Sequence, residues 1–241
     1  MQKIIVVSFA SEKFYRAQQN LNQSLKGNGP TGYSNFNDHN LSDEFKKKNH
    51  KIYNQSRGFG YWCWKPFILL ETLKLLVDGD IVVYLDACNQ VIHPLNYIID
   101  KCNDDGIVLF DNRDGNYQHE CWINSEWTKR DCFTLMNCDE PKYWEGKQCN
   151  ASYQLYKKCS KSIRFLEEYM GFCENENIIT DMPNITSDNF PEFKDHRHDQ
   201  SIVSLLAIKN DIELLPDPSE WGNWELSRPY PQLFWHCRGL L

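Results

Sequence analysis

The sequence has no long hydrophobic run. No stretch approaches the roughly 20 consecutive apolar residues that a membrane-spanning helix requires. The apolar run at residues 4–7 is too short for the hydrophobic region of a secretory signal, and Ser-Glu-Lys follows it where a cleavage site would lie. We therefore expect no membrane span and no secretory signal.

Positive charge is also scarce. Lys and Arg number 26 against 33 Asp and Glu, which gives a formal net charge of −7 at pH 7. An acidic chain has no general electrostatic field that would draw it to nucleic acid or anionic lipid. We accordingly expect no nucleic-acid partner.

Paired cysteines and the common phosphate-binding motifs are missing as well. The 10 Cys are scattered without a Cys-x-x-Cys pair, which indicates reduced thiols in a cytoplasmic protein. There is no Walker A motif and no Gly-x-Ser-x-Gly elbow. Residues 27–32 match Gly-x-Gly-x-x-Gly by letter, but they follow an expected helix instead of a strand, so we interpret them as a surface loop.

What the chain does have is an ordinary globular composition with many aromatic residues. Hydrophobic residues make up 41% of the 241 residues, charged residues 24% and aromatic residues 14%. Aromatic side chains fill cores, but they also stack on sugars and nucleobases. The length allows one or two domains, and no linker or repeat divides the chain, so we expect a single domain over residues 1–241.

Apolar patterning predicts alternating strands and helices. The expected strands cover residues 3–9, 81–85, 106–110, 151–157 and 212–215, and the expected helices cover residues 11–25, 42–49, 66–77, 94–102, 127–136, 161–173 and 197–209. The tail from residue 217 is expected to be irregular. Such alternation predicts an α/β fold in which helices flank a mostly parallel, Rossmann-like sheet.

Asp86 directly follows the strand expected over residues 81–85, which consists of five apolar residues. In open α/β sheets, ligands bind beyond the carboxyl ends of the strands. Asp86 is therefore placed to hold a metal ion or a ligand hydroxyl. A turn or helix-capping aspartate is the alternative.

Three strings of residues carry a resemblance to a known family. Residues 57–66 read Arg-Gly-Phe-Gly-Tyr-Trp-Cys-Trp-Lys-Pro, residues 84–87 read Tyr-Leu-Asp-Ala, and residues 196–201 read His-Arg-His-Asp-Gln-Ser. In this order they resemble small single-domain glycosyltransferases of the GT-A fold, known from bacterial polysaccharide loci and large DNA viruses. The resemblance implies a GT-A fold, a nucleotide-sugar donor that is UDP- or GDP-linked, and a role in polysaccharide biosynthesis.

The resemblance also implies how the donor would bind. The end of the first strand, with Ser8 and Phe9, would cup the nucleotide base. Ala87 and Asn150 would lie near the diphosphate and the donor sugar, and His198, in the last matching string, would also bind the donor.

A divalent metal is part of the same expectation. The family's Asp-x-Asp motif holds Mn²⁺ or Mg²⁺ beside the diphosphate. His236 would be a further ligand, and a tail residue packed by Trp235 is the alternative. This chain has Cys88 in place of the second carboxylate, and a thiol is a soft ligand that suits these hard cations poorly. Asp86 would either hold the ion with water or bind a sugar hydroxyl instead.

Cations and aromatic rings complete the predicted site. Arg57, Lys65 and Arg238 could neutralise the leaving diphosphate, or they could be solvated surface charges. If the loop around Trp62 and Trp64 is extended, both rings point to one side and could wall the sugar or the base; core packing is the alternative.

Asp199 and Gln200 open an expected helix. Asp199 could accept hydrogen bonds from sugar hydroxyls or take a proton from the acceptor, and Gln200 could hold the sugar. Helix capping is the alternative for Asp199.

The sequence thus predicts an enzyme that moves a sugar from a nucleotide-diphosphate sugar to a hydroxyl of a glycan or another acceptor. A non-catalytic nucleotide-sugar or carbohydrate-binding module is the first alternative, because the second carboxylate is absent. A sugar nucleotidyltransferase is the second, but the residues after the first strand contain no Gly-rich basic loop.

Overall fold

A six-stranded sheet forms the centre of the protein. The computed structural model describes residues 1–113, 121–222 and 229–237. The strands of the sheet are β1 (Ile4–Phe9), β2 (Gly32–Phe36), β3 (Ile81–Leu85), β5 (Ile107–Phe110), β6 (Tyr153–Lys157) and β7 (Leu214–Leu215), in the order β2-β1-β3-β6-β5-β7. Only β6 is antiparallel to its neighbours, and the other pairs are parallel. The mainly parallel sheet predicted from the sequence is confirmed.

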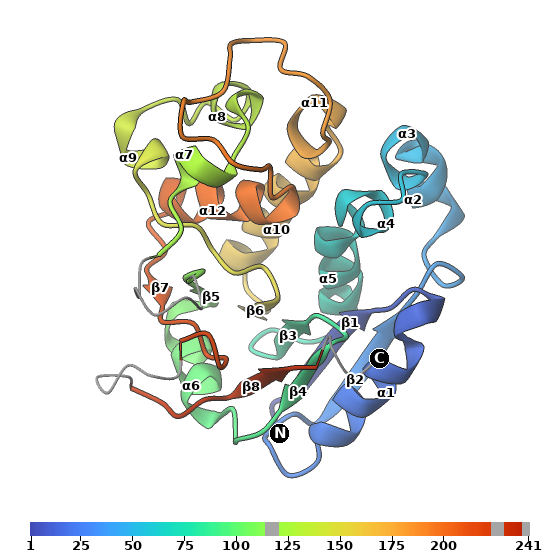
Figure 1. The fold of residues 1–241 in the computed structure, drawn as a ribbon. Helices are drawn as coiled ribbons and strands as arrows, with labels where there is room; N and C mark the ends of the chain where they lie inside the picture. The colour runs from blue at the N-terminus through green and yellow to red at the C-terminus, as the bar shows by residue number, and fades with distance from the viewer. Residues whose placement is uncertain (114–120, 223–228, 238–241) are drawn as a thin grey trace.

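Helices cover both faces of this sheet (Figure 1). The helices α1 (Tyr15–Ser24) and α6 (Asn96–Asp105) pack on one face, and α5 (Trp64–Lys74), α10 (Ser160–Cys173) and α12 (Asp199–Lys209) pack on the other. Alternate side chains of a strand point to opposite faces. In β3, Val82 and Tyr84 accordingly join the core under α5 and α10, whereas Ile81 and Val83 join the core over α1 and α6. Both faces are buried, which explains the unbroken apolar run of this strand.

Shorter elements complete the fold. They are the 3-10 turn η1 (Glu12–Phe14), the helices α2 (Asp43–Lys48), α3 (His50–Tyr53), α4 (Gly58–Tyr61), α7 (Asn124–Trp127), α8 (Arg130–Leu135), α9 (Pro141–Trp144) and α11 (Glu176–Ile179), and the antiparallel pair β4 (Asn89–Val91) and β8 (Phe234–His236). Among the described residues, no helix has the length and apolar character needed to cross a membrane.

Three sequence expectations about the elements are wrong. No strand was expected between residues 25 and 42, but this segment contains β2, an edge strand that pairs with β1 although it is polar. The helix expected over residues 127–136 is broken, because Thr128 and Lys129 are extended and the Lys129 amide donates to His196 Nδ1 instead of continuing a helix. The tail expected to be irregular contains β8, whose partner strand β4 lies almost 150 residues earlier.

Candidate active site

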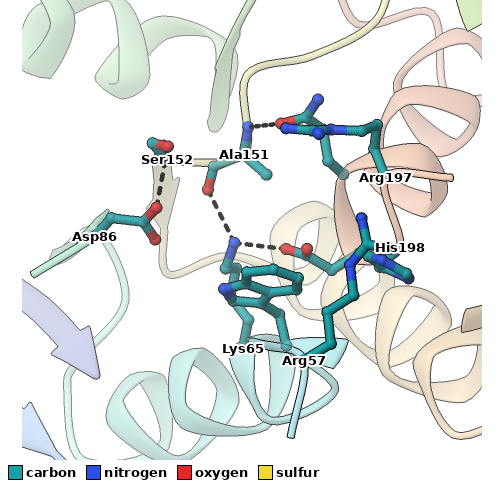
Figure 2. Close-up of a pocket in the computed structure, with 10 residues that line it drawn as sticks. Arg57, Lys65, Asp86, Ala151, Ser152, Arg197 and His198 are labelled. Carbon is teal, nitrogen blue, oxygen red and sulfur yellow. Dashed lines mark hydrogen bonds and ion pairs between the residues drawn. The ribbon is translucent and has the colours of Figure 1, made fainter. Parts of the chain in front are cut away.

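A pocket lies beside the carboxyl end of β3 and the first turn of α12 (Figure 2). Its lining residues are Arg57, Trp62, Lys65, Asp86, Ala151, Ser152, Arg197, His198, Asp199 and Gln200. Seven of these were named from the sequence as candidate site residues. They come from segments that are far apart in the chain, so the fold brings together the residues of the three matching strings.

The loop that carries Trp62 is wound in a left-handed turn. Residues 58–62 all have positive φ, and the amides of Tyr61 and Trp62 donate to the carbonyls four residues earlier. A left-handed conformation costs a non-glycine residue about 1–2 kcal/mol, and backbone strain of this kind concentrates at functional sites. The extended loop considered from the sequence is therefore not what the structure shows.

This turn separates the two tryptophans. Trp62 remains at the pocket, whereas Trp64 begins α5 and stacks on Phe9 with ring centroids 4.1 Å apart. Trp64 and Phe9 both belong to the buried core. For Trp64 the core-packing alternative is the one that the structure shows.

Asp86 is held at the end of β3 by two hydroxyl groups. Tyr84 donates to Oδ1 at 2.7 Å and Ser152 donates to Oδ2 at 3.0 Å. The Asp86 amide also donates to the Ser152 carbonyl. The carboxylate is therefore oriented toward the pocket by neighbours on β3 and before β6, and it does not cap a helix.

Asp199 forms a buried ion pair with Lys65. Lys65 Nζ lies 2.5 Å from Asp199 Oδ2 and donates to the Ala151 carbonyl at 3.0 Å. Figure 2 shows the Lys65 ammonium group with dashed lines to two oxygen acceptors, one of which is the Ala151 carbonyl. Lys65 is 2% exposed, so it is not a solvated surface charge. Burial raises the pKa of Asp199, and Lys65 then counteracts part of that rise.

Gln200 is held at both ends of its amide. Its Nε2 donates to Gln148 Oε1 at 2.8 Å, and its Oε1 accepts from the Ala151 amide at 3.4 Å. These contacts fix the side chain against the segment before β6. The amide can therefore present a defined edge to a sugar in the pocket.

The other cations of the pocket are balanced by carboxylates. Arg57 pairs with Asp181 at 3.1 Å and with Asp195 at 2.7 Å, and Arg197 lies 3.6 Å from the same Asp195 carboxylate. Both arginines are partly exposed. They are in place to approach a phosphate, which would have to compete with these carboxylates.

His198 connects this charged cluster to α12. Its backbone φ is 54°, in the left-handed region, and its Nδ1 lies 2.8 Å from the Ile179 carbonyl. Burial lowers the pKa of His198 to about 4. The ring is therefore neutral near pH 7, with Nδ1 as the donor.

The remaining predicted residues that the structure describes do not line this pocket. Ser8 is buried and accepts a hydrogen bond from Gln18, and Ala87 is buried beside Asp86. Asn150 donates to Tyr153 and to Asp217. Arg238 lies outside the described residues.

His236 is engaged away from Asp86. Its Nδ1 lies 3.2 Å from Glu220 Oε1 and accepts from Trp221 Nε1, and its Nε2 faces the Tyr153 hydroxyl. No three His, Cys, Asp or Glu side chains in the described ranges are grouped as metal ligands. Cys88 is buried beside Cys237. These residues do not fit the metal centre that the resemblance implies.

Besides Ala151, which directly follows the predicted Asn150, sequence reasoning missed two lining residues. Arg197 lies inside the His-Arg-His-Asp-Gln-Ser string, so its position in that motif could have identified it. Ser152 carries no signal of its own, because its role depends on the antiparallel pairing of β6 with β3.

Comparison with known proteins finds similarity only in structure. No family model and no curated sequence matches the chain. The chain superposes on the galactosyltransferase LgtC in complex with donor and acceptor sugar analogs, with a TM-score of 0.52, 12% identity, and coverage of 98% of this chain and 87% of that one. A glycosyltransferase involved in the glycosylation of the major capsid of PBCV-1 gives a TM-score of 0.52 and 11% identity, with coverage of 98% of this chain and 95% of that one. Mouse xyloside xylosyltransferase 1, in its apo form, gives a TM-score of 0.49 and 10% identity, with coverage of 98% of this chain and 97% of that one.

At these identities the likeness shows the fold alone. That fold is the GT-A fold of glycosyltransferases, as the three sequence strings predicted.

Proposed function

We propose that the protein is a glycosyltransferase that moves a sugar from a nucleotide-diphosphate sugar, UDP- or GDP-linked, to a hydroxyl of a glycan or another acceptor. The observation that carries the proposal is the pocket in which Asp86 and the Asp199–Gln200 pair lie together on a glycosyltransferase fold. The pocket is polar and has carboxylates, an amide and cations on its wall. These groups match the hydroxyls of a sugar and the charge of a leaving diphosphate.

The base and ribose would bind at the end of β1, and the sugar would lie between Asp86 and Asp199. A hydroxyl of the donor can donate to Asp86. Arg57 and Arg197 can move toward the diphosphate as the glycosidic bond breaks, because their present partners are partly exposed. We derive no step that passes through Mn²⁺ or Mg²⁺, since the described residues do not form a ligand set for either ion.

A cytoplasmic location is part of the proposal. All 10 cysteines are free thiols, and eight of them are buried. Free thiols suit a reducing compartment.

A screen of nucleotides tests the donor class. Thermal-shift measurements with UDP, GDP, CDP and ADP, each with Mn²⁺, with Mg²⁺ and with EDTA, should give one clear stabilisation. A flat response to all four would contradict the proposal. Stabilisation that appears only with a divalent ion would contradict the interpretation that the site works without a bound metal.

Asp86→Asn tests the site itself. The amide keeps the shape of the side chain, so stability should change little, while transfer should fall on the order of a hundredfold or more because a carboxylate contact to the donor is lost. Asp100→Asn, at an exposed position on α6, is the control and should behave as the wild type. Unchanged transfer by Asp86→Asn would show that this carboxylate is structural.

A non-catalytic binding module is the second candidate, favoured by Cys88 at the position of the second carboxylate. It predicts nucleotide-sugar binding with no transfer and no donor hydrolysis. Product analysis by NMR separates the two candidates, and the anomeric configuration of any product shows whether transfer inverts or retains.

A further inference from the structure

One of the two carboxylate oxygens of Asp199 is hydrogen-bonded to buried side chains on the side away from the pocket. Oδ2 accepts from Lys65 Nζ at 2.5 Å and from the Tyr169 hydroxyl at 3.1 Å. The same hydroxyl lies 3.2 Å from the Asp199 backbone carbonyl. Within the described residues Oδ1 accepts no hydrogen bond, and it is not among the fully buried polar atoms, so it faces the pocket.

Neither donor can turn away to solvent. Lys65 is 2% exposed and Tyr169 is fully buried. Lys65 Nζ also lies 4.7 Å from the centre of the Tyr84 ring, and the Tyr84 hydroxyl donates to Asp86. The two pocket carboxylates are thus joined through buried groups whose positions the core determines.

On the basis of the proposed function, we infer that Lys65 and Tyr169 are positioning residues, which hold Asp199 by Oδ2 so that Oδ1 is presented to the sugar or the acceptor hydroxyl. Lys65 therefore acts on Asp199 and not on the leaving diphosphate. A carboxylate fixed in this way does not have to be ordered when the substrate arrives, which is the benefit of a preorganised site.

The electrostatic surroundings of Asp199 agree with this role. The titratable and charged groups that face it are Cys63 and Lys65 around the start of α5, Tyr169 and Cys173 on α10, Asp86 after β3, and Arg57, Arg197 and His198 at the pocket wall. Tyr156 on β6 belongs to the same core, but its hydroxyl donates to Gln154 and not to Asp199. Burial and Asp86 raise the pKa of Asp199, while Lys65 and the Tyr169 hydroxyl lower it. Loss of either donor should therefore raise the pKa.

Two matched variants test the inference. Tyr169→Phe removes only the hydroxyl that contacts Asp199. Tyr156→Phe removes the same group from an equally buried ring, whose hydroxyl donates to Gln154. We expect Tyr169→Phe to lower kcat on the order of tenfold, with the KM for the donor within a few-fold of the wild-type value. The acid limb of the pH profile of kcat should move to higher pH. Tyr156→Phe should leave kcat, the KM for the donor and the acid limb of the pH profile as in the wild type.

A measurement without turnover accompanies the kinetics. The carboxyl ¹³C signal of Asp199, assigned by its loss in Asp199→Asn, gives the pKa of that group by titration. It should be higher in Tyr169→Phe and higher still in Lys65→Met, because the Lys65 charge is the larger influence. If Lys65→Met does not fold, the two tyrosine variants still give the comparison.

The outcomes separate this inference from the proposed function. Equal kcat, equal acid limbs and equal Asp199 titrations in Tyr169→Phe and Tyr156→Phe would overturn the positioning role. A shifted titration in a protein that transfers no sugar would confirm the contact and contradict the proposed function.

Discussion

Trp62 and Trp64 lie two residues apart and have different surroundings. Trp62 is the last residue of the left-handed turn and lines the pocket, where its ring centroid lies 5.8 Å from that of His198. Trp64 is 3% exposed and stacks on Phe9 of β1. At the scale of single residues, one motif therefore supplies both a pocket wall and a core anchor.

Replacing each tryptophan should separate activity from stability. Trp64→Ala leaves a large cavity and should lower the free energy of unfolding by about 3–5 kcal/mol. Trp62→Ala should cost stability about 1 kcal/mol and reduce transfer more strongly than Trp64→Ala does. Urea unfolding and steady-state kinetics on both variants give the comparison. Equal losses of stability would show that Trp62 is also a core residue.

Gly58 should be required for the position of the Trp62 ring, because there is no space for a side chain at this residue. A Cβ at Gly58 would lie 2.3 Å from the Trp62 ring, and its φ of 57° is unfavourable for other residues. Gly58→Ala should therefore displace Trp62 from the pocket and weaken donor binding, which calorimetry measures. Gly171→Ala, in α10 with open space around the new methyl group, is the control and should be neutral or slightly stabilising. Unaltered donor affinity in Gly58→Ala would contradict the packing of this turn.

At the scale of elements, a long irregular segment brings much of the site into place. Residues 180–198 contain no helix or strand, yet they carry Asp181, Asp195 and His198 to the pocket. The region of α7 and α8 anchors this segment. Lys129 Nζ donates to the Met182 carbonyl at 2.8 Å, and the buried Asp131 carboxylate accepts from the amides of residues 185 and 186.

Asp131→Asn should loosen this segment. The amide carries no charge and has one acceptor oxygen in place of two, so the Ile185 N–H, which now donates to both oxygens, loses one of its acceptors. The loss of this charge-assisted contact should cost about 1–3 kcal/mol. Hydrogen exchange at Ile185 and Thr186 should become faster, and urea unfolding should show the loss of stability. Asp43→Asn, at a fully exposed position, is the control. Unchanged exchange in Asp131→Asn would show that the other contacts are sufficient.

At the scale of the whole molecule, two buried histidines make stability depend on pH. His196 accepts from the Lys129 amide through Nδ1, and its Nε2 lies 2.9 Å from the Ile178 carbonyl, so the neutral ring fits both partners. Burial lowers the pKa of His196 far below 6.5 and that of His198 to about 4. Between about pH 6.5 and 4 the unfolded chain therefore binds more protons than the folded one, and stability falls as the pH falls.

The melting temperature should accordingly decrease from pH 7 to pH 4.5. The contribution of His198 alone is at most about 3 kcal/mol. In His196→Gln the decrease should be smaller, because the amide stays neutral, whereas His39→Gln, at an exposed position, should follow the wild type. A melting temperature that does not change over this range would contradict the neutral burial of both rings.

The sequence by itself determined the α/β class, most strands and seven of the ten residues that line the pocket. Buried strands such as β3 are continuous apolar runs, and each string around Trp62, Asp86 and Asp199 consists of consecutive residues. Both kinds of pattern can therefore be recognised from the sequence alone. Asp199 at the start of α12 was predictable from the helical spacing that follows it.

Only the tertiary structure decided which charges meet. Lys65 and Asp199 are separated by 134 residues, and their pairing results from the packing of α5 and α12 on the same face of the sheet. The polar strand β2 and the pairing of β4 with β8 also depend on neighbours that are distant in the chain. Tyr169 reads as an ordinary core residue of an amphipathic helix, because its hydroxyl has a partner only when α10 packs against the first turn of α12. Hydrophobic periodicity records which side of an element is buried, but it carries no information on which polar group lies across the interface.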